Sequence, residues 1–173
     1  MAFGLYLHIP YCLAKCRYCD FYSKGGSRGV PQEYVDALVH RMDEFRRKGL
    51  LAPHPDTVYF GGGTPSLLTP EQAARLIAAA SPASGAEVTL EANPETVNEE
   101  ILTGFLQAGV NRLSLGVQTA FDESLARLGR PHTAAQSREA FRAARQAGFA
   151  NINGDIMMAL PRYTREEFDA TLE

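Results

Sequence analysis

The segment LYLHIPYCLAKCRYCD, residues 5–20, joins a short apolar run to a loop with three closely spaced cysteines. Cys12, Cys16 and Cys19 form the pattern C-x3-C-x2-C, and the chain has no other cysteine. An odd number of cysteines within eight positions cannot build a framework of disulfides. The pattern instead indicates metal or redox chemistry in a reducing compartment.

The composition is that of a globular protein with one core. The chain has 173 residues, of which 45% are hydrophobic, so residues 1–173 are expected to form one domain or most of one. The formal charge of −3 gives no basic field, so nucleic acid is not an expected partner. No apolar run approaches the roughly 20 residues that cross a bilayer, and the N-terminus lacks the pattern of a signal peptide. A cytoplasmic location is therefore expected.

Short apolar runs alternate with longer amphipathic stretches along the whole chain. The apolar runs predict strands near residues 5–9, 58–60, 88–91, 112–116 and 151–157. The amphipathic stretches predict helices near residues 31–48, 70–80, 99–108, 133–147 and from 164 onward. Strict alternation predicts an α/β fold with a parallel sheet and right-handed crossovers. Periodicity alone does not decide between an open sheet and part of a barrel.

The expected last helix has barely begun when the sequence ends at residue 173, before any glycine or proline boundary. We therefore expect a piece of a longer protein, with five strand–helix units and an open sheet edge. The composition shows no linker and no second domain within the chain.

Three thiolates on one loop suit an iron–sulfur cluster, because each can bind a different iron of the same cubane. Three protein ligands leave the fourth iron of a [4Fe–4S] cluster open. An open iron can chelate the amino and carboxylate groups of S-adenosylmethionine (SAM), whose reductive cleavage releases a 5′-deoxyadenosyl radical. Two other interpretations remain at this point. The cysteines could be buried as small hydrophobic residues, or they could bind zinc with Asp20 or His8 as the fourth ligand.

Together with its flanking sequence, the cysteine motif resembles a known family. The run YLHIPY, residues 6–11, before C-x3-C-x2-C is similar to the oxygen-independent coproporphyrinogen III oxidase-like family of the radical SAM superfamily. The resemblance continues throughout the chain. It implies a partial TIM-type barrel, the radical SAM core, with the cluster and SAM at the carboxyl ends of the strands.

The segment GGGTP, residues 61–65, follows the second expected strand. It matches neither the dinucleotide-binding glycine pattern nor a P-loop. Glycines let a ligand approach the main chain closely, although a bare tight turn would use the same residues. The resemblance implies that Gly62, Gly63 and Thr64 bind the methionine amino group of SAM.

Further polar residues near the expected strand ends resemble the family's SAM and substrate cavity. The resemblance implies that Glu91 accepts the ribose hydroxyls; as an isolated acid it would be a capping or solvated residue. Asp155 stands in an otherwise apolar strand, where an unpaired carboxylate is costly, so a polar cavity should meet it. The resemblance adds four more contacts to SAM or substrate: Tyr6, Tyr18, Gln118 and Arg130. Without it, Gln118 would be a loop hydrogen bonder, Arg130 a surface charge and Asp155 a salt-bridge partner.

His8 alternates with Tyr6 along the first strand, so both side chains should point to the barrel interior. There His8 could serve as a donor near the substrate, or it could be a satisfied core histidine. The other histidines, His40, His54 and His132, show no partnering pattern and are expected at the surface or in loops.

The residue two positions after the third cysteine separates two branches of the family. The oxidases resemble C-x3-C-x2-C-x-C, whereas this chain has Phe21 there, which offers no thiol. The resemblance therefore implies the heme-chaperone branch, which binds heme and passes it to respiratory hemoproteins. Alternatives are the oxidase itself, a non-catalytic heme-binding module with a structural cluster, and an RNA-modifying radical SAM enzyme, which the acidic balance disfavours.

Overall fold

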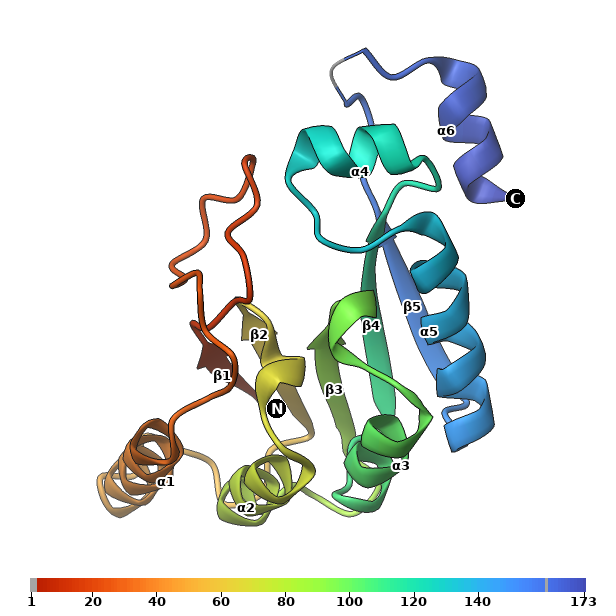
Figure 1. Cartoon of the computed structure of the whole chain (residues 1–173). Coiled ribbons are helices and arrows are strands. Elements are labelled where there is room, and N and C mark those ends of the chain that lie inside the picture. Colours follow the sequence, from red (N-terminus) through yellow and green to blue (C-terminus); the bar gives the residue numbers. More distant parts are fainter. Residues whose placement is uncertain (1–2, 161) are drawn as a thin grey trace.

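Strands and helices alternate along the chain, as the sequence predicts (Figure 1). The computed structural model describes residues 3–160 and 162–173. The strands are β1 (Gly4–Ile9), β2 (Thr57–Gly62), β3 (Glu87–Ala92), β4 (Arg112–Gln118) and β5 (Asn151–Ile156). The helices are α1 (Gln32–Arg47), α2 (Pro70–Ala80), α3 (Glu99–Gln107), α4 (Asp122–Leu128), α5 (Ala134–Ala147) and α6 (Arg165–Leu172). No helix within the described residues is long and apolar enough to span a bilayer.

Short elements at the strand ends add detail to the predicted alternation. The 3₁₀ turns η1 (Pro65–Leu67) and η2 (Pro94–Thr96) begin at prolines soon after β2 and β3, because proline fixes φ at a value that suits a tight turn. In the structure α4 lies where β4 leaves the sheet (Figure 1).

Helix boundaries follow recognisable sequence signals. Thr69, Thr133 and Thr164 each begin a helix with a capping box, in which side chain and main chain exchange hydrogen bonds with the residue three positions later. Gly129 and Gly148 end α4 and α5 with φ values of 74° and 103°, a left-handed backbone that glycine adopts without strain. The threonine caps mark where a loop ends and a helix begins, and the glycine caps mark where a helix ends and the next loop begins.

The five strands form one parallel sheet in the order β1-β2-β3-β4-β5. When strand order follows chain order, right-handed crossovers put all the connecting helices on one face. Helices α1, α2, α3 and α5 lie along one side of the sheet in Figure 1. A doubly wound sheet would reverse its strand order and carry helices on both faces. The sheet is therefore a segment of a barrel wall, and the predicted partial barrel is confirmed.

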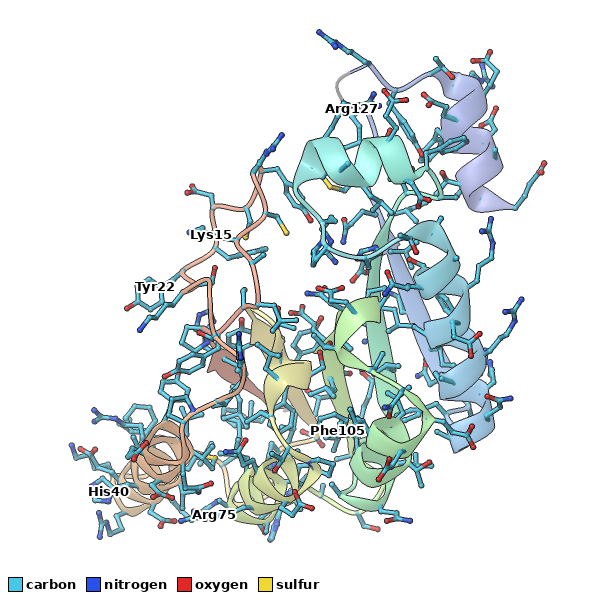
Figure 2. All side chains as sticks on the ribbon, viewed as in Figure 1. Lys15, Tyr22, His40, Arg75, Phe105 and Arg127 are labelled. Atoms are coloured by element: carbon cyan, nitrogen blue, oxygen red, sulfur yellow. The ribbon has the colours of Figure 1, made fainter. Side chains whose placement is uncertain are left out.

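The hydrophobic core lies between the sheet and these helices. Side chains alternate across each strand, and the helix-facing positions are apolar and buried, as at Ile9, Phe60, Leu90 and Leu113. From the helix layer, Phe105 of α3 belongs to the same cluster (Figure 2). Burying one such side chain stabilises the fold by about 1.5–3 kcal/mol. This layer holds the strands in register.

The opposite face of the sheet carries polar side chains that are aligned across the strands. Neighbouring strands pair His8 with Gly61, Glu91 with Ser114, and Ser114 with Asn153. The connecting helices do not cover this face, which corresponds to the inside of a barrel. The pairing brings polar groups from several strands to the same level near the carboxyl ends.

We expect Phe105→Ala to lower the free energy of unfolding by about 3–5 kcal/mol, because it removes a fully buried ring and leaves a cavity. The measurement is urea unfolding followed by circular dichroism. Phe45→Ala is the matched control, since Phe45 also lies in a helix but is 40% exposed. Its cost should stay near 1 kcal/mol, which allows for the lost contact with Arg41. Equal losses in the two variants would contradict this description of the core.

Candidate functional site

A cavity of about 320 Å³ opens at the carboxyl ends of the strands. The loop after β1 forms one wall, and the other walls come from residues at or near the ends of β2, β3, β4 and β5 and from Arg130, which follows α4. Most residues that the sequence singled out line this cavity: Cys12, Cys16, Tyr18, Cys19, Gly62, Gly63, Thr64, Glu91, Gln118, Arg130 and Asp155. Two singled-out residues, Tyr6 and His8, are not among the lining residues. The cavity is thus where a parallel barrel presents its functional groups.

Backbone hydrogen bonds hold the base of the cysteine loop. The Cys12 N–H donates to Lys24 O at 3.0 Å, and the Lys24 N–H donates to Pro10 O at 2.8 Å. At the end of β2, the N–H groups of Gly63 and Thr64 donate to the carbonyls of Ile9 and Tyr11, at 2.8 Å each. The start of the loop is therefore an ordered extension of the sheet.

The middle of the cysteine loop rests on the carboxyl end of α4. The Arg17 N–H donates to Leu128 O at 3.0 Å, and the Arg17 guanidinium donates to Arg127 O at 3.4 Å. A cation at a helix carboxyl end is favoured by the helix dipole. Figure 2 shows the loop with Lys15 and Tyr22 beside the helix that carries Arg127. Two separate elements, β2 and α4, thus fix the loop.

The three cysteines are free thiols, with Cys12 buried and Cys16 and Cys19 partly exposed. Within residues 3–160 and 162–173, no three His, Cys, Asp or Glu side chains stand close enough together to hold a single metal ion. Both ring nitrogens of His8 already have partners, the Tyr6 hydroxyl at 3.1 Å and Tyr22 O at 2.9 Å. The described residues therefore do not form the zinc site with His8. A cubane cluster does not need three ligands around a single metal ion, because each thiolate binds a different iron.

The glycines at the end of β2 are required by close packing against β1 and the residues that follow it. Gly62 has φ +115°, and a β-carbon there would lie 2.5 Å from the His8 ring. A β-carbon on Gly63 would lie 2.7 Å from Tyr11 O. Packing alone thus explains both glycines. Because they also line the cavity, their main chain is open to close approach by a ligand.

Glu91 presents a carboxylate whose two oxygens are both anchored. Its Oε1 accepts a hydrogen bond from the Tyr59 hydroxyl at 2.8 Å, and its Oε2 accepts one from the Gly62 N–H at 3.1 Å. Burial and the hydrogen bond to Glu91 raise the pKa of Tyr59 above its ordinary value. Each carboxylate oxygen keeps a lone pair for a further donor. The capping or solvated role that an isolated acid would have does not apply to Glu91.

Arg130 links the cysteine loop to the strand ends. Its Nη2 donates to Asn93 Oδ1 and to Gly116 O, at 2.7 Å each, and its Nη1 lies 3.4 Å from Cys16 Sγ. The Arg130 Nε is buried and has no hydrogen-bond partner among the described residues. A buried N–H without an acceptor is costly. An anionic group in the cavity would supply that acceptor.

On the far wall, Asp155 and Gln118 occupy the ends of β5 and β4. Asp155 accepts hydrogen bonds from Ser114 Oγ at 2.9 Å and from Asn153 Nδ2 at 2.7 Å. The polar surroundings expected for Asp155 are therefore present. Gln118 has φ +68° at an irregularity in the β4–β5 pairing, a conformation that side-chain-bearing residues adopt only under strain.

The structure places Tyr6 and His8 together, Tyr18 in the cavity, and His132 in the protein interior. Tyr6 and His8 share one face of β1, as predicted, and the Tyr6 hydroxyl contacts His8. Tyr18 lines the cavity, where burial raises its pKa to about 12 while the Arg130 charge acts in the opposite direction. The sequence predicts His132 at the surface or in a loop. It lies in the loop between α4 and α5, but it is 3% exposed, so a surface position is wrong. Its partners are Glu95 Oε2 at 3.2 Å and Val117 O at 3.3 Å, and both lie far away in the sequence.

Sequence reasoning missed Asn93 and Ser114, which also line the cavity. Asn93 receives Arg130 and donates to Thr64 Oγ1 at 3.1 Å, so it joins two walls of the site. Ser114 is paired across the sheet with Glu91 and Asn153. Strand alternation could have indicated both residues, because side chains two positions apart in a strand point to the same face. Asn93 is two positions after Glu91, and Ser114 is two positions before Gly116.

We expect His132→Ala to lower the free energy of unfolding by about 1–3 kcal/mol, because the Glu95 carboxylate, 10% exposed, loses its hydrogen bond. His40→Ala is the control, since His40 lies on the exposed side of α1 (Figure 2), and it should change stability by less than about 0.5 kcal/mol. Urea unfolding at neutral pH measures both. A His132→Ala protein as stable as the parent would show that the pair contributes nothing.

Comparison with known proteins gives matches over almost the whole chain. Residues 6–173 match the radical SAM superfamily. A protein of Haemophilus influenzae named heme chaperone HemW is 39% identical over 172 residues, which are 95% of this chain and 45% of that protein. A Bos taurus protein named radical S-adenosyl methionine domain-containing protein 1, mitochondrial, is 36% identical over 91% of this chain and 36% of its own length.

Among solved structures, the fold is similar to coproporphyrinogen III oxidase (HemN) from Escherichia coli, described as a radical SAM enzyme. The TM-score is 0.83 at 28% identity, and the match covers 99% of this chain and 40% of the oxidase. The chain thus spans less than half the length of the relatives and of the solved structure that it matches.

Proposed function

Because the chain belongs to the radical SAM superfamily, we propose that Cys12, Cys16 and Cys19 hold a [4Fe–4S] cluster and that the adjoining cavity binds SAM. The family prediction made from the sequence is confirmed, and membership implies both cofactors. The observation that carries the proposal is the position of three free thiols in the wall of one cavity with the polar strand ends.

The residues present fit these cofactors. Three thiols supply a donor set for iron and leave one coordination site to a small ligand. Arg130 offers the cavity a positive charge and a buried N–H that has no acceptor among the described residues. This is the chemistry that a carboxylate ligand requires. When bound, the reduced cluster supplies the electron that breaks a carbon–sulfur bond of SAM.

Each remaining wall of the cavity has a distinct role in the proposal. The main chain at Gly62 and Gly63, with Thr64, receives the amino end of SAM, and Arg130 receives its carboxylate. Glu91 accepts the ribose hydroxyls with the lone pairs that Tyr59 and Gly62 leave free. Gln118 and Asp155 close the far wall, and Tyr18 flanks the cluster. His8 does not line the cavity in the described structure, so we give it no role in SAM binding.

For the whole protein, we propose that it binds heme and delivers it to hemoproteins. Similarity to proteins named heme chaperone supports this, and so does Phe21, which lines the cavity and offers no thiol. We place this function in the cytoplasm, because three closely spaced free thiols suit a reducing compartment. Residues 1–173 would form the amino-terminal part of the radical SAM core in that protein.

One alternative has an observation of its own. The structural similarity to coproporphyrinogen III oxidase favours an oxidase that decarboxylates a porphyrinogen. Phe21 argues against it, because the oxidase motif places a cysteine at this position. A non-catalytic heme-binding module would share the cluster but would not cleave SAM.

Anaerobic reconstitution with iron and sulfide should give about four irons per chain. After reduction, the electron paramagnetic resonance spectrum should change when SAM is added. Replacing Cys12, Cys16 or Cys19 with alanine should abolish both the iron content and the spectral change with SAM, because a ligand to iron is lost. Ser23→Ala is the matched control, since Ser23 lines the same cavity on the same loop. Unchanged iron content in all three cysteine variants would overturn the cluster assignment.

The full-length protein should bind heme without converting coproporphyrinogen III, because Phe21 supplies no reactive thiol beside the cluster. The assay is anaerobic incubation with reductant, SAM and coproporphyrinogen III, alongside a heme titration of the same preparation. Protoporphyrinogen formed over many turnovers, with no heme bound, would make the protein an oxidase. Heme binding with no cleavage of SAM would instead favour the non-catalytic module.

A further inference from the structure

Tyr59 lies on β2, on the face of the sheet that the connecting helices leave uncovered. In the sheet register it stands between Tyr6 of β1 and Thr89 of β3. Tyr59 does not line the cavity. Its hydroxyl reaches the cavity indirectly, through the hydrogen bond of 2.8 Å to Glu91 Oε1.

Two donors fix the orientation of the Glu91 carboxylate. The Tyr59 hydroxyl occupies one lone pair of Oε1, and the Gly62 N–H occupies one lone pair of Oε2 at 3.1 Å. Hydrogen bonds to an ionised group are the stronger ones. The carboxylate plane is therefore set before any ligand arrives, with one lone pair on each oxygen left for a pair of neighbouring hydroxyls.

The Tyr59 ring is itself held in place. It stacks on Tyr6, with ring centroids 6.1 Å apart and planes inclined by 20°. Gly61 makes room for this pair, since a β-carbon there would lie 2.8 Å from Tyr6 Cε2 and 3.0 Å from Tyr59 Cε1. A ring confined on two sides loses little further freedom when its hydroxyl binds Glu91.

We propose that Tyr59 is a positioning residue, which orients Glu91 so that both carboxylate oxygens meet the ribose diol of SAM. This rests on the proposed function, in which Glu91 accepts the ribose hydroxyls. Tyr59 acts through Glu91 and does not touch the ligand. Burial raises the pKa of the Tyr59 hydroxyl further above its ordinary value of 10.0, so at neutral pH the hydroxyl is protonated and donates to the carboxylate.

The test compares how strongly the reconstituted protein binds SAM and a SAM analogue without the 2′ and 3′ hydroxyls. The preference for SAM is the ratio of the two dissociation constants, measured by titration calorimetry under anaerobic conditions. Tyr59→Phe should lower this preference about tenfold, the effect of one hydrogen bond to a charged group. Binding of the analogue should change little.

Three further variants make the result specific. Tyr34→Phe removes the same hydroxyl elsewhere, because Tyr34 donates to the His8 carbonyl at 2.8 Å, and it should leave the preference unchanged. Glu91→Gln should lower the preference, and adding Tyr59→Phe to it should have no further effect if Tyr59 acts only through Glu91.

The outcomes separate this inference from the proposed function. If Glu91→Gln lowers the preference and Tyr59→Phe does not, Tyr59 has no positioning role, although the SAM site stands. If Tyr59→Phe weakens both ligands equally, its role is structural and the inference is wrong. If Glu91→Gln keeps the parent's preference, Glu91 does not bind the diol, and the proposed site fails together with the role of Tyr59.

Discussion

The parallel register of the five strands is the constraint on which the rest of the structure depends. Parallel pairing brings every carboxyl end to the same edge, and strand alternation then assigns each side chain to one of two faces. One face buries Phe60, Leu90 and Leu113 against the helices, which fixes the register. The other face carries polar groups such as Glu91 and Ser114, which are aligned across the strands and lie outside the apolar core.

Polar groups at the strand ends are held by partners from distant segments. Glu91 of β3 is anchored by β2, and Arg130, after α4, is anchored by Asn93 and by the β4 carbonyl of Gly116. His132, two residues after Arg130, is buried against Glu95 and β4. The walls of the cavity are thus tied to one another by hydrogen bonds, and the charges of Glu91 and Arg130 are each oriented by a neighbour on a different strand or loop.

Features that depend on local spacing could be predicted from the sequence. The five strands, the cap at Thr69 and the shared face of Tyr6 and His8 follow from periodicity and short signals. The cysteine loop and the lining residues Glu91 and Asp155 were found because they stand in recognisable motifs or at strand ends. The burial of His132 and the contact of Tyr59 with Glu91 could not be predicted, since their partners are 37 and 32 residues away. The choice of a barrel wall over a doubly wound sheet also required the strand order, which periodicity does not contain.

The hydrogen bonds that tie the cysteine loop to itself and to α4 have a thermodynamic consequence for the proposed iron–sulfur site. Ordering the backbone of one residue costs about 1–2 kcal/mol of conformational entropy. Between Pro10 and Lys24 much of this cost is met when the sheet folds, because the ends of the loop are already joined. Iron affinity and fold stability are therefore linked quantities. With the cluster held as proposed, substitutions that loosen β2 or α4 will weaken iron binding without touching a thiol, and the bound cluster will in turn resist unfolding of both elements.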